Sequence, residues 1–223
     1  MELSEPLVQD EVRSCLSFDA GMSLRQRRIL RVALRLFAEN EYAGVSLRDI
    51  ASEAGVSLTL IDHHFGAKHA LFAAVVRSWC PVFGHAALEI RHALAQARVG
   101  GARELLAMVL SPVETLLADP DGPPVLRLWA RHRHGTELAI SGPMGLAIEP
   151  FRSMIERALE RVYPHSAAQD RAWAVAFAIA AILEFAVAEL PGSDSALPAG
   201  TASGGRGQLM RHIEAGWQAS LGG

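Results

Sequence analysis

The feature that most constrains the fold of this chain is a set of short helical patterns between residues 27 and 71. Apolar residues recur at spacings of three and four from Ile29 onward, which predicts a helix with one buried face. Two shorter patterns follow Ser46 and Ser57, with Gly55 between them. Glycine alone takes positive φ without strain, so Gly55 fits a tight turn. This layout is that of a helix-turn-helix, which places side chains in a DNA groove.

The boundaries of these helices are marked by local signals. Ser46 can cap the second helix, with Asp49 three residues on as the partner in a capping box. Ser57 can cap the third helix. Gly66 then breaks the chain, and a further helix is expected to start at Lys68.

Residues 24–72 resemble the DNA-binding domain of the TetR (tetracycline repressor-like) family. The residues that match in register are Ala33, Leu36, Phe37, Ile50, Ala51, Ala54, Gly55, Val56, Ser57, Phe65 and Lys68. The resemblance implies a DNA-binding head followed by an all-helical domain that dimerises and binds a small effector. Beyond residue 72 it covers only the layout of the helices.

Composition favours the same class of fold. Half of the 223 residues are hydrophobic, and strand-like alternation is scarce, so an all-α protein is expected. We expect three parts: an acidic mobile tail over 1–22, a helix-turn-helix DNA-binding domain over 23–70, and a helical effector-binding and dimerisation domain over 71–223.

The net charge is only −3, so any binding of nucleic acid must come from a local patch. Arg25, Arg27 and Arg28 form such a patch, a basic arm that can lie at the edge of a duplex. An ordinary solvated helix face is the alternative interpretation of these arginines.

The third helix is expected to enter the major groove by its N-terminal end. Ser57 can cap it and reach a phosphate, while Leu58 and Thr59 can contact a thymine methyl. Arg48 can pair with guanine or with a phosphate. The residues expected to contact DNA are Arg25, Arg27, Arg28, Ser46, Arg48, Ser57, Leu58, Thr59, Asp62, His63, His64 and Lys68.

Two residues depart from the family pattern. Thr59 replaces a small residue, often glycine, and Asp62 replaces a tyrosine that commonly touches the DNA backbone. A carboxylate near phosphates is repulsive unless it faces cytosine N4 or pairs with an arginine. Leu58 could instead belong to the core, and His63 and His64 could be plain surface histidines.

Longer helices follow Lys68. The expected segments are 68–97 with an interruption near Pro81, a helix ending at 118, a turn over 119–124, and helices over 125–134, 146–163, 167–190 and 208–221. Residues 135–145 are poorly patterned, and 192–207 have the composition of a flexible loop.

The family resemblance implies an effector pocket among the central helices. Trp129, Phe151 and Phe177 are expected to line it, which favours a largely apolar or aromatic effector with a few polar anchors. Aromatic residues at helical spacing are also common in an ordinary core, and that alternative stays open.

The helix over 167–190 is rich in alanine and apolar on more than one face, which indicates burial on two sides. With 208–221 it could form a four-helix interface across a two-fold axis, as the family does. A homodimer would match a palindromic operator in double-stranded DNA. The alternative is an internal core helix of a monomer.

Other classes of protein have weaker support. His132 and His134 point about 200° apart on a helix, so no metal is expected. Cys15 and Cys80 follow no paired pattern, which fits a reducing cytoplasm. The longest apolar run, 172–183, is too short to span a membrane. No nucleophile elbow or phosphate loop is present, so neither an enzyme nor a cofactor is expected.

These patterns predict a cytoplasmic, sequence-specific transcriptional regulator, expected to be a repressor released by a small, largely apolar effector. Two alternatives stay open. One is an all-α enzyme or metal-binding bundle that carries an N-terminal helical trio, and the other is a DNA-binding dimer without an effector. The operator, the regulated genes, the identity of the effector and the role of residues 1–22 do not follow from the sequence.

Overall fold

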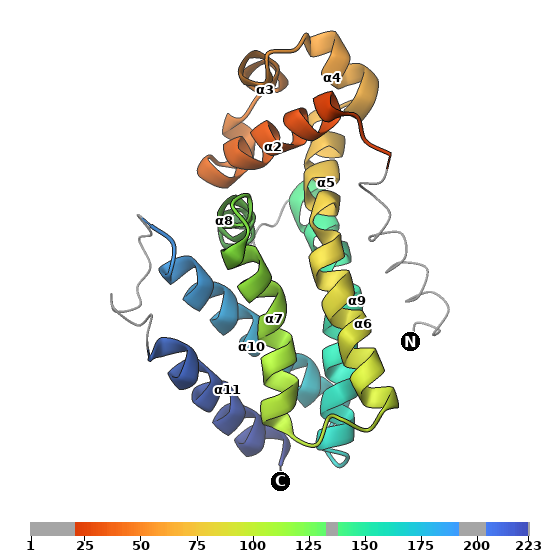
Figure 1. The fold of residues 1–223 in the computed structure, drawn as a ribbon, viewed down its shortest axis with the longest axis vertical. Coiled ribbons are helices and arrows are strands. Elements are labelled where there is room, and N and C mark those ends of the chain that lie inside the picture. Colours follow the sequence, from red (N-terminus) through yellow and green to blue (C-terminus); the bar gives the residue numbers. More distant parts are fainter. Residues whose placement is uncertain (1–20, 133–137, 192–203, 223) are drawn as a thin grey trace.

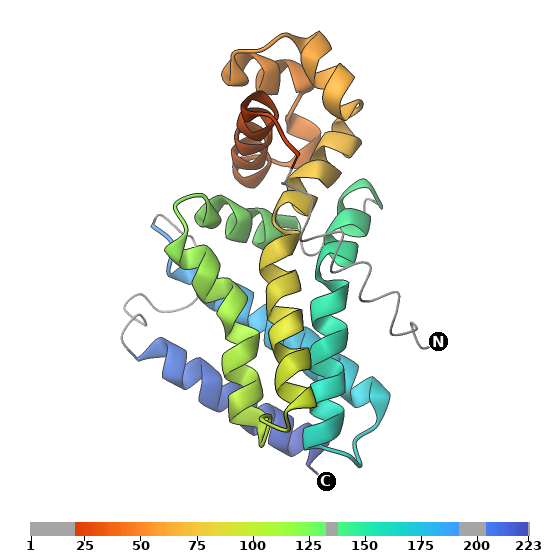
Figure 2. The same cartoon turned by 45° about the vertical axis from the view of Figure 1, so that its right-hand side comes forward.

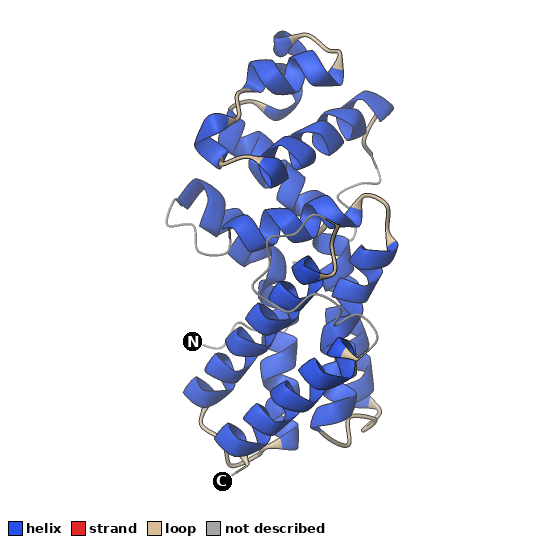
Figure 3. Cartoon of the chain, turned by 90° about the vertical axis from the view of Figure 1, so that its left-hand side faces the viewer, coloured by secondary structure: helices blue, strands red, loops and turns tan. Residues whose placement is uncertain are grey.

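The computed structural model describes residues 21–132, 138–191 and 204–222. Within these ranges the chain is helical and has no strand, which confirms the expected all-α class (Figure 3). The elements are α2 (Leu24–Glu39), η1 (Tyr42–Gly44), α3 (Leu47–Ala54), α4 (Leu58–Phe65), α5 (Lys68–Ser78), α6 (Cys80–Ala95), α7 (Ala102–Ala118), α8 (Gly122–His132), α9 (Leu138–Val162), α10 (Ala168–Ala188) and α11 (Gly205–Leu221). Residues 1–20 of the tail expected over 1–22, His134, and residues 192–203 of the expected loop lie outside the described residues.

The helices form a head and a body (Figure 1). Helices α2, α3 and α4 lie together at one end, and α5 runs from them into the bundle made by α6 to α11. Helices α7, α6 and α9 stand side by side, while α10 crosses behind them (Figure 2). α5 therefore connects the head to the body along the chain.

The head is built on the apolar face of α2. Ile29, Ala33 and Phe37 are completely buried, as their spacing predicted. The Phe37 ring packs edge-on against Phe72 of α5, with ring centroids 5.2 Å apart. Ser23 starts α2 with a capping box that the sequence analysis did not identify. The core of the head thus continues directly into α5.

The segment expected as one interrupted helix consists of α5 and α6, which are bent by 41° at Trp79. Pro81 is at the second position of α6. Proline is tolerated there because the first amides of a helix have no partner within the helix. The predicted interruption near Pro81 is therefore confirmed.

Three predicted helix starts were wrong. α11 begins at Gly205 rather than 208, within the segment expected to be a loop. α8 begins at Gly122 rather than 125, because Pro123 and Pro124 fit the first turn of a helix. α9 begins at Leu138 rather than 146 and contains Pro143 and Pro150. Packing of α9 along α5 and α6 retains the helix through both prolines.

Gly122 makes the tight connection between α7 and α8. A Cβ atom at this position would lie 1.8 Å from the carbonyl oxygen of Leu116, a backbone atom that cannot rotate away. Only glycine allows α8 to leave α7 this closely.

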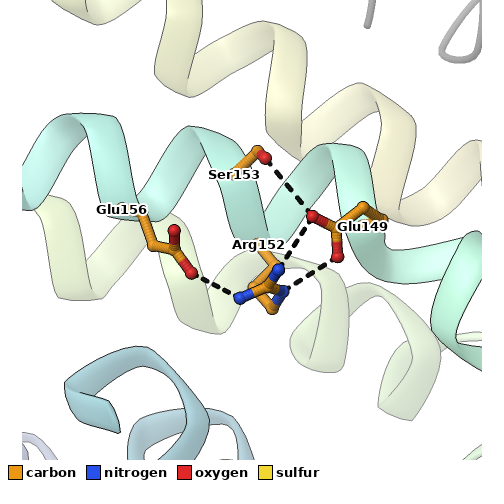
Figure 4. Close-up of polar contacts among 4 residues, drawn as sticks. All are labelled: Glu149, Arg152, Ser153 and Glu156. Carbon is orange, nitrogen blue, oxygen red and sulfur yellow. Dashed lines mark hydrogen bonds and ion pairs between the residues drawn. The ribbon is translucent and has the colours of Figure 1, made fainter. Parts of the chain in front are cut away.

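A polar network lies along one face of α9 (Figure 4). The Arg152 guanidinium donates two hydrogen bonds to Glu149, at 2.8 and 2.9 Å, and one to Glu156 on the next turn. Ser153 also bonds the Glu149 carboxylate, at 3.5 Å. Burial raises the pKa of Glu156 despite the attraction of Arg152, and the negative charge of Glu149 adds to this rise.

Candidate DNA-binding interface and effector cavity

The first helix of the candidate DNA-binding motif is fixed by the predicted capping box. The Asp49 amide donates to Ser46 Oγ at 3.2 Å, and the Ser46 amide donates to the Asp49 carboxylate at 3.0 Å. These bonds to Ser46 hold the pKa of Asp49 below its ordinary value. The start of α3 is therefore set by local contacts alone.

The turn between α3 and α4 is made by Gly55, in the left-handed region at φ 62° and ψ 41°. The next amide, of Val56, returns to the carbonyl oxygen of Ala51 at 3.0 Å. The Arg28 guanidinium covers this turn, because a Cβ atom on Gly55 would lie 3.3 Å from its Nη2 atom. Gly55 thus makes the turn between the two helices, as predicted.

The second helix, α4, exposes the face expected to read DNA. Ser57 caps it by accepting from the Leu60 amide at 3.2 Å, and Ile61 is completely buried beneath it. The burial of Ile61 fixes the rotation of α4 about its axis. Leu58 is 40% exposed, so it does not belong to the core of the head. The other exposed residues of this helix are Thr59, Asp62, His63 and His64.

The basic residues named from the sequence lie around this motif. Arg25, Arg27, Arg28 and Arg48 are all exposed, on α2 and α3. Arg35 of α2 pairs with Glu53 of α3, and Arg31 pairs with Asp121 of the body at 2.9 Å. Exposed arginines thus lie on both α2 and α3, beside the exposed face of α4.

Lys68 differs from the other predicted DNA contacts. Its Nζ atom donates to the carbonyl oxygens of Tyr42 and Val45, at 2.7 and 2.9 Å, and lies 4.2 Å from the centre of the Tyr42 ring. Two of its three N–H donors therefore connect α5 to η1 and the residue after it. The predicted phosphate contact would have to use the remaining donor.

A small cavity of about 50 Å³, partly open to solvent, lies in the body between α6, α7, α8, α9 and α10. Phe83 is at the centre of an aromatic group on its wall, 5.4 Å from Trp129 and 6.1 Å from Phe151 between ring centroids. The lining consists of Phe83, Val109, Pro112, Val113, Leu116, Leu126, Trp129, Ile148, Phe151, Ile179, Ile182 and Leu183. Trp129 and Phe151, both predicted from the sequence, are in this set.

The prediction that Phe177 lines the pocket was wrong. Phe177 is 67% exposed and stacks on Trp173, with ring centroids 5.6 Å apart. α10 turns Val175, Ala178 and Ile182 inward instead. Because α10 is apolar around most of its circumference, its sequence does not show which face is inside.

The helix-turn-helix geometry agrees with comparison to known proteins. The family described as bacterial regulatory proteins, tetR family, matches residues 29–75, which run from α2 into α5. This chain carries the DNA-binding domain of the TetR family. The match covers the head and the start of α5, so it identifies the head as a DNA-binding domain.

Known relatives match the TetR-family head rather than the whole chain. The transcriptional regulator BetI of Agrobacterium fabrum is 40% identical over 55 residues, which are 25% of this chain and 27% of that protein. The transcriptional repressor AcnR of Corynebacterium diphtheriae is 41% identical over 56 residues, 25% of this chain and 30% of that protein. The chain therefore matches under a third of the length of these relatives.

The body shares its fold with solved structures at lower identity. A tetR-family transcriptional regulator from Streptomyces coelicolor superposes with a TM-score of 0.55 and 17% identity, over 89% of this chain and 81% of that one. This agreement covers the arrangement of helices in the TetR-family head and in the body together.

α8 lies between the cavity and the TetR-family head. Its Leu126 and Trp129 side chains line the cavity. At its end, the Arg131 Nε atom donates to the carbonyl oxygen of Ala38 at 3.1 Å, and His132 Nε2 lies 3.2 Å from that of Phe37. The last four carbonyls of a helix lack partners within the helix, so α8 supplies partners for the end of α2.

Ion pairs reinforce both ends of this contact. Asp121, just before α8, pairs with Arg31 of the head, and Arg131 pairs with Glu41 at 3.2 Å. The head is thus attached to α8 at two places along α2.

An apolar surface faces solvent on the side opposite to the cavity. Trp173 and Phe177 of α10 are 57% and 67% exposed. α10 is also tied to α11, because the Trp217 indole N–H donates to the carbonyl oxygen of Ala174 at 3.1 Å. α10 is 21 residues long and apolar enough to cross a membrane, a property that core helices of soluble proteins share.

The part of the chain that the structure describes has no group of three or more His, Cys, Asp or Glu side chains that could hold a metal ion. His132 is used in the contact with Phe37, which is a structural role.

Proposed function

We propose that this protein is a dimeric transcriptional repressor that leaves its operator when a small, uncharged effector fills the cavity. The observation that carries the proposal is the position of α8. One helix contributes Leu126 and Trp129 to the cavity wall and binds the end of α2 through Arg131 and His132.

The proposed DNA contact is supported by the TetR-family head. Its recognition helix, α4, has an exposed face, and exposed arginines lie on the adjoining α2 and α3. Phosphate contacts by such arginines supply most of the affinity of DNA-binding proteins. Ser46, Ser57, Arg48 and the arginines of α2 are proposed to hold the backbone, and Leu58 and Thr59 to face base edges.

The proposed dimer is supported by the Trp173–Phe177 pair. Two large stacked rings on an exposed helix face form the kind of aromatic patch that dominates protein interfaces. A second copy packing α10 and α11 on the same helices would bury this patch on both sides of a two-fold axis. Two heads in one dimer would then meet the two halves of a palindromic operator in the cytoplasm.

The proposed class of effector follows from the lining of the cavity. All twelve lining side chains are aliphatic or aromatic, and their only polar atom is the indole nitrogen of Trp129. A charged ligand would lose its hydration without a partner there, which is costly. The sequence led us to expect a few polar groups that hold the effector, but the lining offers one side-chain donor, the indole N–H of Trp129.

Effector binding is proposed to act through α8. A ligand against Leu126 and Trp129 would displace that helix relative to α7 and α9, and with it the contacts to Phe37 and Ala38. The head would then take another angle to the body, which would change the spacing of the two recognition helices in the dimer.

The proposal is tested by titrating the purified protein against DNA from its own upstream region, at two salt concentrations with random competitor. Binding of two chains per site that resists competitor and weakens steeply with salt is expected. Neutral 1-naphthol should then weaken this binding at least about tenfold, whereas anionic 1-naphthoate should not, because only the neutral probe suits an apolar wall. Equal effects of the two probes would contradict the effector class, and no competitor-resistant binding to any selected DNA would contradict the function.

A further inference from the structure

The exposed face of the recognition helix carries a carboxylate. Asp62 is exposed, one residue after the buried Ile61 that fixes the rotation of α4. Thr59 lies three residues earlier and Leu58 four residues earlier, so all three side chains share the face that is turned away from the core of the head. Whatever α4 presents to DNA therefore includes Asp62.

The carboxylate of Asp62 has no partner within the described residues. The backbone carbonyl of Asp62 accepts from the Gly66 amide at 2.9 Å, but no hydrogen bond or ion pair involves its side chain. Two cations of the head are engaged elsewhere, since Arg35 pairs with Glu53 and Lys68 bonds two carbonyl oxygens. Asp62 is thus a solvated anion on a surface otherwise suited to phosphates.

A carboxylate in that place must either repel DNA or meet a donor on it. In the major groove only cytosine N4 and adenine N6 offer hydrogen atoms. Adenine N6 is adjacent to N7, which is an acceptor and repels a carboxylate, while cytosine presents its amino group without that neighbour. Cytosine is therefore the base that an ionised aspartate fits.

We infer that Asp62 is a specificity-determining residue that accepts a hydrogen bond from the N4 amino group of one cytosine in each half of the operator. This inference rests on the proposed function, because it requires α4 to lie in a major groove. It assigns one base pair of each half-site and leaves the positions facing Leu58 and Thr59 to apolar contacts with other bases.

The test is selection of binding sequences from random double-stranded DNA with the wild-type chain and with Asp62→Asn. The wild-type selection should fix C·G at one position of each half-site, and changing that pair should weaken binding about tenfold or more. Asp62→Asn should lose that preference and favour adenine at the same position, because an amide can pair with both N6 and N7. All other positions should be unchanged.

A matched control separates base recognition by Asp62 from the effect of removing one negative charge. Glu104→Gln removes one exposed carboxylate at the start of α7, at the end of the body far from the head, and should leave the selected sequence unchanged (Figure 1). Helical circular dichroism of both variants checks that they fold.

Three outcomes would overturn the inference. Identical selected sequences for wild type and Asp62→Asn would show that Asp62 does not read a base. Tighter binding of Asp62→Asn to all sequences alike would show that the carboxylate only repels phosphates. If the wild-type chain selects no sequence at all, the proposed function fails, and this inference fails with it.

Discussion

His132 and Phe37 join the two parts of the molecule through one buried hydrogen bond. The Nε2 atom of His132, at the end of α8, lies 3.2 Å from the carbonyl oxygen of Phe37 near the end of α2. Its ring also meets Phe72 edge-on, with ring centroids 5.9 Å apart. Since α2 cannot satisfy that carbonyl itself, the body completes the hydrogen bonding of the head.

Replacing His132 with leucine should therefore lower the stability of the fold and reduce the effect of the effector on DNA binding. The Phe37 carbonyl would be left buried without a donor, and the free energy of unfolding should fall by about 1–3 kcal/mol. Urea denaturation measures this loss. In DNA titrations the variant should respond less to 1-naphthol than wild type does.

His132→Gln is the informative control, because its amide keeps a donor. It should recover part of both losses. If His132→Leu changed neither the stability nor the response of DNA binding to 1-naphthol, this hydrogen bond would not couple the cavity to the head.

Filling the cavity should abolish the response to the effector without preventing DNA binding. Ile179 is a half-buried residue on the cavity wall, and Ile179→Phe adds volume where space already exists. Calorimetry should show at least about tenfold weaker binding of 1-naphthol. Leu209→Phe, at a half-buried position of α11 outside the cavity, should bind the probe as wild type does. Equal binding by both variants would mean that the probe binds elsewhere.

The exposed rings of α10 should control the oligomeric state. Replacing both Trp173 and Phe177 with serine removes the apolar patch while leaving the inner face of α10 intact. Sedimentation should then show a monomer at concentrations where the wild-type chain is a dimer. Leu24→Ser removes another exposed apolar side chain, 85% exposed on α2, and should leave the dimer intact. A dimer that survives the double change would contradict the proposed interface.

The α9 network gives a prediction about pH. Burial raises the pKa of Glu156 above its ordinary value of 4.5, so the folded chain holds this proton more tightly than the unfolded chain. Stability from this group is fully present below about pH 4.5 and is lost as the pH rises through the folded value. Glu156→Gln should remove this pH-dependent loss, as measured by urea denaturation between about pH 4 and pH 7.

Glu149→Gln provides the contrast on the same helix. It removes the carboxylate that holds Arg152 by two hydrogen bonds, so it should destabilise the fold by about 1–2 kcal/mol at neutral pH. If Glu156→Gln destabilises the protein more than Glu149→Gln does, the assignment of roles within the network is wrong.

Most of the head could be predicted from the sequence because its signals are local. The caps at Ser46 and Ser57, the positive φ of Gly55 and the burial of Ile29 and Ile61 all depend on residues a few positions away. Lys68 was harder, since its partners Tyr42 and Val45 lie 26 and 23 residues back along the chain. A side chain that reaches so far in sequence leaves no periodic signal.

The body was predicted less completely for two physical reasons. Prolines usually end helices, but Pro123 and Pro124 begin one, so the start of α8 was placed too late. The apolar character around α10 hid the direction of Phe177, which depends on how the neighbouring helices pack. Trp129 and Phe151 were correctly expected at the cavity. Both are buried among the central helices, where large aromatic side chains are commonly found.

The two hydrogen bonds of Lys68 have a consequence for the motion of the head. They tie the first turn of α5 to the segment between α2 and α3, while the Phe72 ring fills the space beneath it. The amides of α2, α3 and the first turns of α5 should therefore exchange with solvent deuterium as one cooperative unit. The head would then unfold and refold locally as one unit, while the helices of the body remain folded.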